Sequence, residues 1–210
     1  YRAYLQMTAL AVVPPFGVKD GGSAISVYGT NFRWEDDLYC LFGKISKVNA
    51  TAVGSNIVTC VAPKWDVSTS VELAVMSGTG DVATLEDKFE FYTPFIVTLS
   101  VPSSGFLRGG VNVAIHGRHF SQARGPLRCI FGEISVESRI ETDTQIQCTS
   151  PPSSTAGEVQ IAISHGSDEF KLESPLFSYD NEILIDGSRS VVALSNAEKL
   201  VAVHGSSFKN

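Results

Sequence analysis

Apolar residues alternate with polar residues in short stretches along most of the chain. Ile25 and Val27 lie in one such stretch, and Val113 and Ile115 lie in another. Alternation of this kind places successive side chains on opposite faces, so each stretch predicts a half-buried β-strand. Glycines and prolines separate these stretches, and no long stretch has convincing helical periodicity. We therefore predict an all-β chain of short strands joined by turns.

The same pattern recurs at a constant interval along the chain. A hexapeptide with an apolar first residue, a central glycine and a final phenylalanine occurs three times: VYGTNF at 27–32, IHGRHF at 115–120 and VHGSSF at 203–208. Each step is 88 residues (115 minus 27, and 203 minus 115). The interval also relates Cys60 to Cys148 and Gly78 to Gly166. The chain is therefore built from internal repeats.

The repeat divides the chain into four parts. We expect residues 1–5 to be the tail of a preceding repeat, 6–94 and 95–181 to be complete repeats, and 182–210 to be the start of a further, truncated and divergent repeat. Each complete unit contains about seven predicted strands, which suits an immunoglobulin-like sandwich. The links between units are very short, so they favour a semi-rigid rod over a flexible string.

Both ends of the chain fall inside predicted repeats, so we expect it to be a window on a longer array. An alternative exists for the C-terminal strand, since in a fibre it would complete the sheet of a neighbouring chain.

The ordered landmarks of the two complete copies resemble the IPT/TIG repeat. In the first copy these are Pro14, Gly17, Gly21, Gly22, Gly29, Phe32, Cys40, Gly43, Cys60, Pro63 and Tyr92. In the second they are Pro102, Gly105, Gly109, Gly110, Gly117, Phe120, Cys129, Gly132, Cys148, Pro151 and Tyr179. The third copy departs from the pattern, with Ser190 and Ala193 in place of the proline and the first glycine.

The resemblance implies tandem immunoglobulin-like β-sandwiches. Proteins of this family include extracellular receptors such as the plexins, large ciliary and adhesion proteins, Rel-type transcription factors and some polysaccharide-degrading enzymes. The resemblance is specific for the family but not for function.

Four cysteines permit three pairings, and each complete copy contains two of them. The self-consistent choice is Cys40 with Cys60 and Cys129 with Cys148. Such a pairing implies an extracellular or secretory setting. Four buried free thiols are the alternative, and a zinc site is disfavoured because no Cys-x-x-Cys spacing occurs.

Asn49-Ala-Thr51 is an N-glycosylation sequon. Its place between Phe42 and Cys60 predicts an exposed loop that would carry a glycan. The alternative is an unoccupied sequon, because three-residue sequons are common by chance. A turn is the favoured interpretation of TSPPSST at 149–155, and O-linked sugar is the alternative.

Charge and motifs argue against several functions. The net charge of −6 leaves no basic surface for a phosphate backbone, so we expect no nucleic-acid partner. No run of about 20 apolar residues predicts a membrane span in this segment. His116 and His119 are three apart on a predicted strand and point to opposite faces, and the acidic residues 35–37 and 168–169 suit solvated loops better than calcium sites. We predict no enzyme, no metal and no cofactor.

Trp34 and Trp65 each occur in one copy only; Gln122 and Ser153 stand one interval further along. Tryptophan is enriched at interfaces, so one of the two is a candidate contact to a neighbouring repeat or a partner protein. The alternative is that each ring packs on its own domain.

These features together favour a non-enzymatic extracellular rod or spacer. It would act in adhesion or as a structural cell-surface or filament protein, with protein partners or self-association through its tandem domains. The alternative is the stalk of a plexin-like or growth-factor-receptor-like signalling ectodomain.

Overall fold

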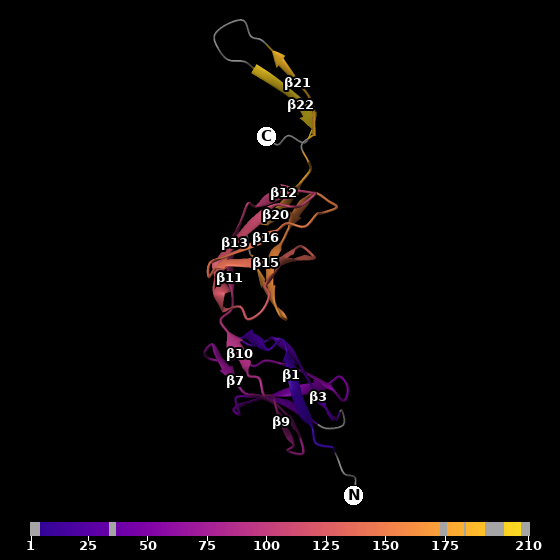
Figure 1. The fold of residues 1–210 in the computed structure, drawn as a ribbon, viewed down its shortest axis with the longest axis vertical. Helices are drawn as coiled ribbons and strands as arrows, with labels where there is room; N and C mark the ends of the chain where they lie inside the picture. The colour runs from indigo at the N-terminus through magenta and orange to yellow at the C-terminus, as the bar shows by residue number, and fades with distance from the viewer. Residues whose placement is uncertain (1–4, 34–36, 173–175, 183, 192–199, 207–210) are drawn as a thin grey trace.

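A computed structural model describes residues 5–33, 37–172, 176–182, 184–191 and 200–206 of the chain. Two β-sandwich repeats follow one another along the long axis, and a hairpin lies beyond the second repeat (Figure 1). The prediction of tandem all-β sandwiches is confirmed, with a single short 3₁₀ helix, η1 (Phe120–Gln122), in the described part. No helix among the described residues is long and apolar enough to cross a bilayer.

The strands follow the same order in both repeats. Those of the first repeat are β1 (Thr8–Val13), β2 (Phe16–Val18), β3 (Ala24–Thr30), β4 (Leu38–Phe42), β5 (Ser46–Ala52), β6 (Ile57–Val61), β7 (Thr69–Val71), β8 (Leu73–Ser77), β9 (Val82–Thr84) and β10 (Phe89–Tyr92). Those of the second are β11 (Ile96–Val101), β12 (Ser104–Phe106), β13 (Asn112–Arg118), β14 (Arg128–Phe131), β15 (Ile134–Thr142), β16 (Gln145–Thr149), β17 (Gly157–Val159), β18 (Ile161–His165), β19 (Asp168–Lys171) and β20 (Phe177–Asp180). The hairpin consists of β21 (Leu184–Val191) and β22 (Leu200–Ser206).

Each repeat contains one long, curved sheet and one short sheet. In the first repeat the long sheet has the order β1-β3-β6-β5-β4-β8-β9 and the short sheet has the order β2-β10-β7. Only Glu72 separates β7 from β8, so the short sheet continues the layer of β4 and β8. The second repeat has the equivalent order in both sheets, which confirms the internal repeat at the level of topology.

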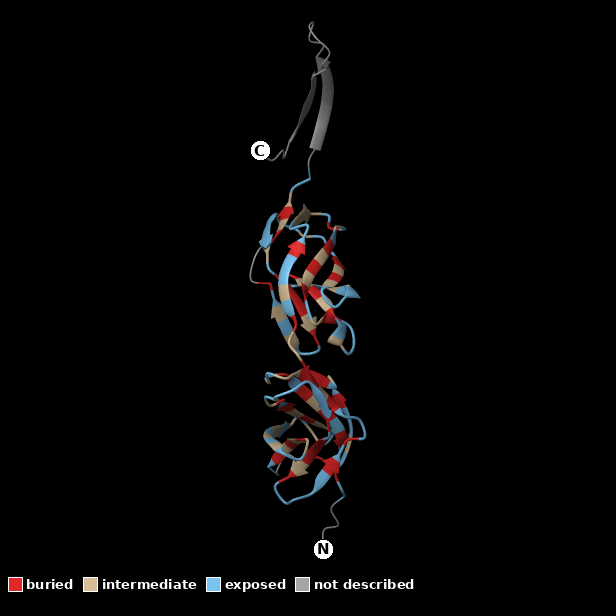
Figure 2. Cartoon of the chain, turned by 90° about the vertical axis from the view of Figure 1, so that its left-hand side faces the viewer, coloured by how far each residue is buried: buried red, intermediate tan, exposed pale blue. Residues whose placement is uncertain are grey.

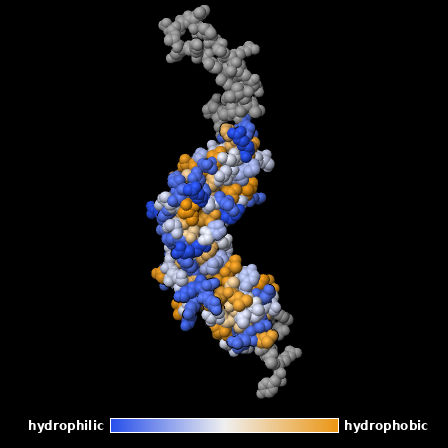
Figure 3. Space-filling model, in the orientation of Figure 1, coloured by the Kyte–Doolittle hydropathy of each residue, from blue (hydrophilic) through white to orange (hydrophobic). Residues whose placement is uncertain are grey.

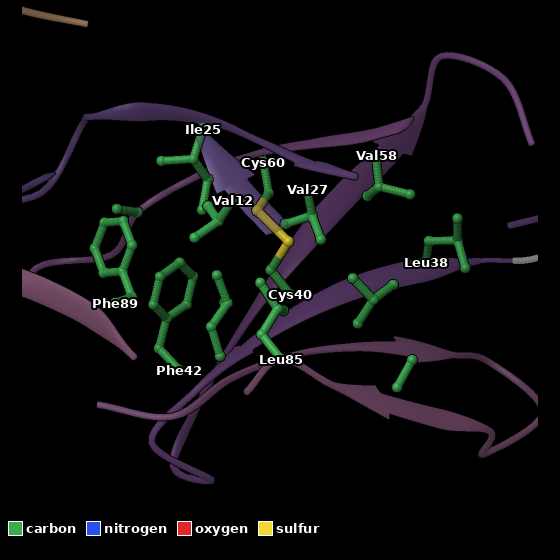
Figure 4. Close-up of a cluster of buried hydrophobic side chains, with 14 of the residues drawn as sticks. Val12, Ile25, Val27, Leu38, Cys40, Phe42, Val58, Cys60, Leu85 and Phe89 are labelled. Carbon is green, nitrogen blue, oxygen red and sulfur yellow. A yellow bond between two sulfur atoms is a disulfide. The ribbon is translucent and has the colours of Figure 1, made fainter. Parts of the chain in front are cut away.

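The core of each repeat consists of the inward residues that alternation predicted. Val27, Phe42 and Phe89 are fully buried, and the Cys40–Cys60 disulfide crosses the middle of their cluster (Figure 4). Cys129 and Cys148 are bonded in the same way in the second repeat. In each repeat the disulfide joins two strands that lie on either side of a third, which is β5 in the first repeat and β15 in the second. The disulfide lies where this middle strand stops pairing with one neighbour and begins to pair with the other.

The repeated Gly-x-x-Phe motif is explained by a close approach of two strands. A Cβ atom at Gly29 would collide with the carbonyl oxygen of Thr8 and with the ring of Phe32. Gly117 is surrounded in the same way by the carbonyl of Ile96 and the ring of Phe120. Glycine is therefore required where the edge strand crosses the buried aromatic ring.

The terminal hairpin resembles one strand pair of each complete repeat. β21 pairs antiparallel with β22, and a register shift lies between Ile185 and Gly187. The pairs β1–β3 and β11–β13 contain a shift at the equivalent place. β21 and β22 thus share their pairing and its register shift with the first pair of strands in each complete repeat.

Candidate functional site: the junction between the repeats

The surface where the two repeats meet is the most elaborate polar and aromatic arrangement in the described part of the chain. β2 and the end of β10 supply it from the first repeat, and the β18–β19 hairpin and η1 supply it from the second. Figure 2 shows buried residues continuing through this narrow point. Phe16 and Tyr92 belong to the first repeat, yet they are part of the buried cluster that forms the core of the second.

Phe16 is inserted against the β18–β19 hairpin. Its ring stacks on the imidazole of His165, with 3.9 Å between centroids and an interplanar angle of 4°. Gly166, at the turn of the hairpin, has φ of 62°, and a Cβ there would lie 2.9 Å from atoms of both Phe16 and Pro14. The turn therefore requires glycine for its backbone conformation and for the close approach of the first repeat.

A hydrogen-bond network crosses the junction beside this stack. The Tyr92 hydroxyl donates to Oδ2 of Asp168 at 2.7 Å, and the Ser23 hydroxyl donates to the same oxygen at 3.0 Å. Ser23 Oγ in turn accepts from the backbone N–H of Val18 at 2.9 Å. Burial, and then the hydrogen bond and charge of Asp168, raise the pKa of Tyr92 well above its usual value. The phenol consequently remains a donor at every physiological pH.

His165 lies at the centre of the junction and has an unusual environment. The residue is fully buried, and neither ring nitrogen has a hydrogen-bond partner of normal geometry. Burial lowers its pKa to about 4, although a contact with the backbone of Arg124 and the charge of Asp168 act in the opposite direction. At neutral pH the imidazole is therefore uncharged, and it packs between Phe16, Tyr92 and Phe95 as an aromatic ring.

Two weaker contacts lie at the rim of the junction. The Nε of Arg124 donates to both carboxylate oxygens of Glu90, at 3.0 and 3.1 Å. The backbone N–H of Thr93 donates to Oε1 of Gln122 at 3.3 Å. Because both sides of the Arg124–Glu90 pair are partly exposed, its contribution to stability is small.

Of the two tryptophans that the sequence offers as interface candidates, the structure describes Trp65. Trp65 stacks on Phe91 of its own repeat, with 5.0 Å between centroids, and packs over Gly43. Trp34 lies outside the described residues. Sequence reasoning missed Phe16, Ser23 and His165. The sequence did contain a signal for them, because the other copy has a residue of a different kind at each equivalent position. These are Ser104 for Phe16, Val111 for Ser23 and Ser77 for His165.

The prediction that Asn49 lies in a loop is wrong. Asn49 is exposed, but it lies in the middle of β5. Residues 46–52 alternate between partly buried and exposed, with Val48 and Ala50 packed against the core and Lys47, Asn49 and Thr51 outward. This period of two was present in the sequence, and the polar outward residues obscured it.

The assignment of Tyr179 as the equivalent of Tyr92 is also wrong. Tyr92 pairs with Val18, and the pair in the same register of the second repeat is Phe106 with Asp180. Tyr179 corresponds to Phe91, and its hydroxyl donates to the carbonyl of Pro151 inside its own repeat.

Comparison with known proteins gives a consistent family and several kinds of relative. A family model described as the IPT/TIG domain matches residues 8–91 and 94–179. Plexin-2 of Caenorhabditis briggsae is 25% identical over 199 residues, which are 93% of this chain and 11% of that protein. Transcription factor COE2 of Danio rerio is 32% identical over 106 residues, which are 49% of this chain and 18% of that protein.

Among solved structures, the extracellular region of plexin A4 is similar with a TM-score of 0.55 at 15% identity. The likeness covers 87% of this chain and 16% of the plexin chain, and at this identity it concerns the fold. The chain spans less than a fifth of the length of each of these proteins. Because the family model covers both complete sandwiches, the chain belongs to the IPT/TIG family.

Proposed function

We propose that this chain is a non-catalytic rod segment of an extracellular protein, and that its role is to hold consecutive IPT/TIG repeats in a fixed relative orientation. The observation that carries the proposal is the insertion of Phe16 and Tyr92 of the first repeat into the buried cluster of the second. A spacer with independent domains would leave these aromatic side chains on its own surface.

The energetics of the junction support a rigid joint. Full burial of a phenylalanine side chain stabilises a structure by roughly 1.5–3 kcal/mol. The two hydrogen bonds to Asp168 add a contribution on the order of 1 kcal/mol each. If the two repeats bent away from each other, both the burial of Phe16 and the hydrogen bonds to Asp168 would be lost. We therefore expect the orientation seen in the structure to dominate.

The extracellular setting has support of a different kind. Two disulfides occur in repeats whose small cores benefit from cross-links, and disulfides persist in oxidising compartments. The similarity to Plexin-2 covers nearly the whole chain. A stalk within a plexin-like signalling ectodomain is therefore the second candidate, and it shares the same mechanical role.

A nuclear role like that of the COE transcription factors is disfavoured by charge. The net charge of −6 opposes binding to a phosphate backbone, whose affinity derives largely from lysine and arginine contacts. The similarity to COE2 also covers about half of this chain rather than both repeats.

The proposal is tested by measuring the orientation of the two repeats in solution. Residual dipolar couplings of backbone amides, combined with small-angle X-ray scattering, report the mean orientation and its spread. We expect one alignment tensor to fit both repeats in the unmodified chain and two separate tensors in the Phe16→Ser variant. Independent tensors in the unmodified chain would refute the rigid-joint function.

A further inference from the structure

A groove runs across the surface of the first repeat. Its volume is about 630 Å³, and residues of β3, β5, β6 and the segment after β6 line it. Prominent among them are Ala24, Val48, Asn49, Thr51, Val61 and Pro63. A groove of this volume lies within the range of about 300–1,000 Å³ that is typical of sites for small molecules.

The groove forms where two strands separate. Residues Ala50 to Ala52 of β5 pair with β6, and Ala50 lies opposite Cys60. Before Ala50, β5 pairs with β4 instead, while the chain after Cys60 continues through Val61 to Pro63 without pairing to β5. Val61 is 53% exposed, so the groove has an apolar wall that no other part of the described chain covers.

Asn49 lies on the wall of this groove with its side chain in solvent. On the side away from the groove, Asn49 lies opposite Tyr39 of β4. The Nζ of Lys47 lies over the Tyr39 ring, 3.5 Å from its centroid. The Lys47–Tyr39 pair thus lies on one side of Asn49, and the groove lies on the other. Thr51, the third residue of the Asn49-Ala-Thr51 sequon, is exposed on the same face of β5.

The second repeat contains a groove in the same place with different chemistry. The pairing register makes Glu137 equivalent to Asn49 and Arg139 equivalent to Thr51, so no sequon occurs there. Thr149 replaces Val61, and its hydroxyl donates to Oδ1 of Asn112 at 3.1 Å. The exposed apolar wall and the sequon thus occur together in one repeat and are both missing from the other.

We propose that Asn49 carries an N-linked glycan and that the first sugar residues of this glycan lie in the groove of its own repeat. The proposal rests on the proposed extracellular function, because attachment requires passage through a secretory pathway. The donor is a lipid-linked pyrophosphoryl oligosaccharide. The Asn49 amide nitrogen forms a bond to C1 of the first sugar and loses a proton, and the bond from C1 to the pyrophosphate oxygen breaks as the lipid pyrophosphate leaves.

The groove suits the first sugar of such a glycan. An N-acetylhexosamine has an apolar ring face and an acetyl methyl group, which can contact Val61 and Ala24. Its hydroxyls and amide can bond to the side chains of Thr51 and Thr59, which line the same groove. Carbohydrate would thereby cover apolar surface that the second repeat avoids by having polar residues there.

Occupancy is the first measurement. The chain, secreted from a eukaryotic host behind a signal peptide, is digested and analysed by mass spectrometry before and after peptide N-glycosidase treatment in ¹⁸O-labelled water. We expect an isotope-labelled aspartate at position 49, and loss of the glycan in Asn49→Gln but not in Thr51→Ser. An unmodified Asn49 in secreted, disulfide-bonded chain would overturn the proposal.

The position of the sugar is the second measurement. The glycan is trimmed to one N-acetylglucosamine, and NMR cross-relaxation between its acetyl methyl and the Val61 methyls is recorded. The matched control is the double variant Glu137→Asn/Arg139→Thr, which places a sequon at the equivalent polar groove. Contacts to Val61, with slow motion of the sugar at 49 and fast motion in the control, are expected.

Equal mobility of the two sugars would overturn placement in the groove. The orientation of the repeats, measured on unglycosylated protein, is independent of both results, so failure here is distinguishable from failure of the rod function.

Discussion

Each complete repeat has one end that faces the part of the chain that follows it. The strand register at this end is the same in both repeats, but the side chains differ. At the end of the first repeat, Phe16 and Tyr92 extend into the next domain. At the end of the second, Ser104 and Asp180 occupy the same positions. This end of the second repeat has an aromatic residue at Phe106 instead, and the guanidinium of Arg108 lies 5.7 Å from the centroid of its ring. Arg108 also forms an ion pair with Glu182 at 3.6 Å.

Different residues therefore specify the sandwich and the joint. Residues that both copies share, such as the glycine of the Gly-x-x-Phe motif and the paired cysteines, belong to the interior of each repeat. Residues that differ between the copies determine what each end face can bind. Joints of different stiffness can therefore be built along one rod without any change in the fold.

The largest effect is expected from replacing Phe16 by serine, the residue at the equivalent position of the second repeat. Removal of a buried phenylalanine ring costs about 3 kcal/mol or more, and here the loss falls on the contact between domains. Both tryptophans lie in the first repeat, so their fluorescence reports the unfolding of that repeat, while hydrogen exchange reports the second. We expect one cooperative transition in the unmodified chain and two in Phe16→Ser.

The control for this variant is Leu10→Ser. Leu10 is also apolar and lies nearby in sequence, but it is 67% exposed. Its replacement is expected to leave the single transition intact. Two transitions in both variants, or one in both, would remove Phe16 from its role in coupling the repeats.

Acidification is expected to weaken the same joint. The pKa of His165 is lowered to about 4 in the folded chain from 6.5, so the unfolded or separated form binds a proton more readily. The stability that neutral His165 provides is complete above pH 6.5 and is lost as the pH falls from 6.5 through 4. The pKa difference corresponds to roughly 3 kcal/mol.

NMR titration of the imidazole resonances measures this effect directly. The spread of inter-repeat orientation should increase below pH 6.5 and should no longer depend on pH between 6.5 and 4 in His165→Ser, which has the residue found at position 77. A His165 that titrates near its ordinary pKa, with no change in orientation, would contradict the prediction.

The sandwiches could be predicted from sequence, and the joint between them could not. A period of two in residues such as Ile25 and Val27, repeated at a fixed interval, identifies inward faces because burial acts on every strand in the same way. The joint depends on which side chains from distant segments meet, and Asp168 is 145 residues from Ser23. Residue type offered the tryptophans as candidates, and it gave no reason to select Phe16 and His165, whose rings stack at the joint.

A smaller effect is expected from Tyr92→Phe. The variant keeps the ring but removes the hydroxyl that donates to Asp168, which costs about 1 kcal/mol because Asp168 then retains only Ser23 from the first repeat. Tyr179→Phe is the matched control, since its buried hydroxyl bonds to Pro151 within one repeat. Both variants should lower the free energy of unfolding, but only Tyr92→Phe should widen the spread of inter-repeat orientation.

The smallest effect is expected at the rim. Glu90→Gln removes the ion pair with Arg124, and because both side chains are partly exposed the loss should be about 0.5 kcal/mol or less. Raising the salt concentration should reproduce the change in the unmodified chain and have no further effect in the variant, since screening acts on the same Coulomb interaction. Orientation measured by dipolar couplings at low and high salt decides the matter. If Glu90→Gln disturbed the joint as strongly as Phe16→Ser, charge at the rim rather than the buried aromatic contact would control the alignment, and the contrast between the two repeat ends would need a different physical basis.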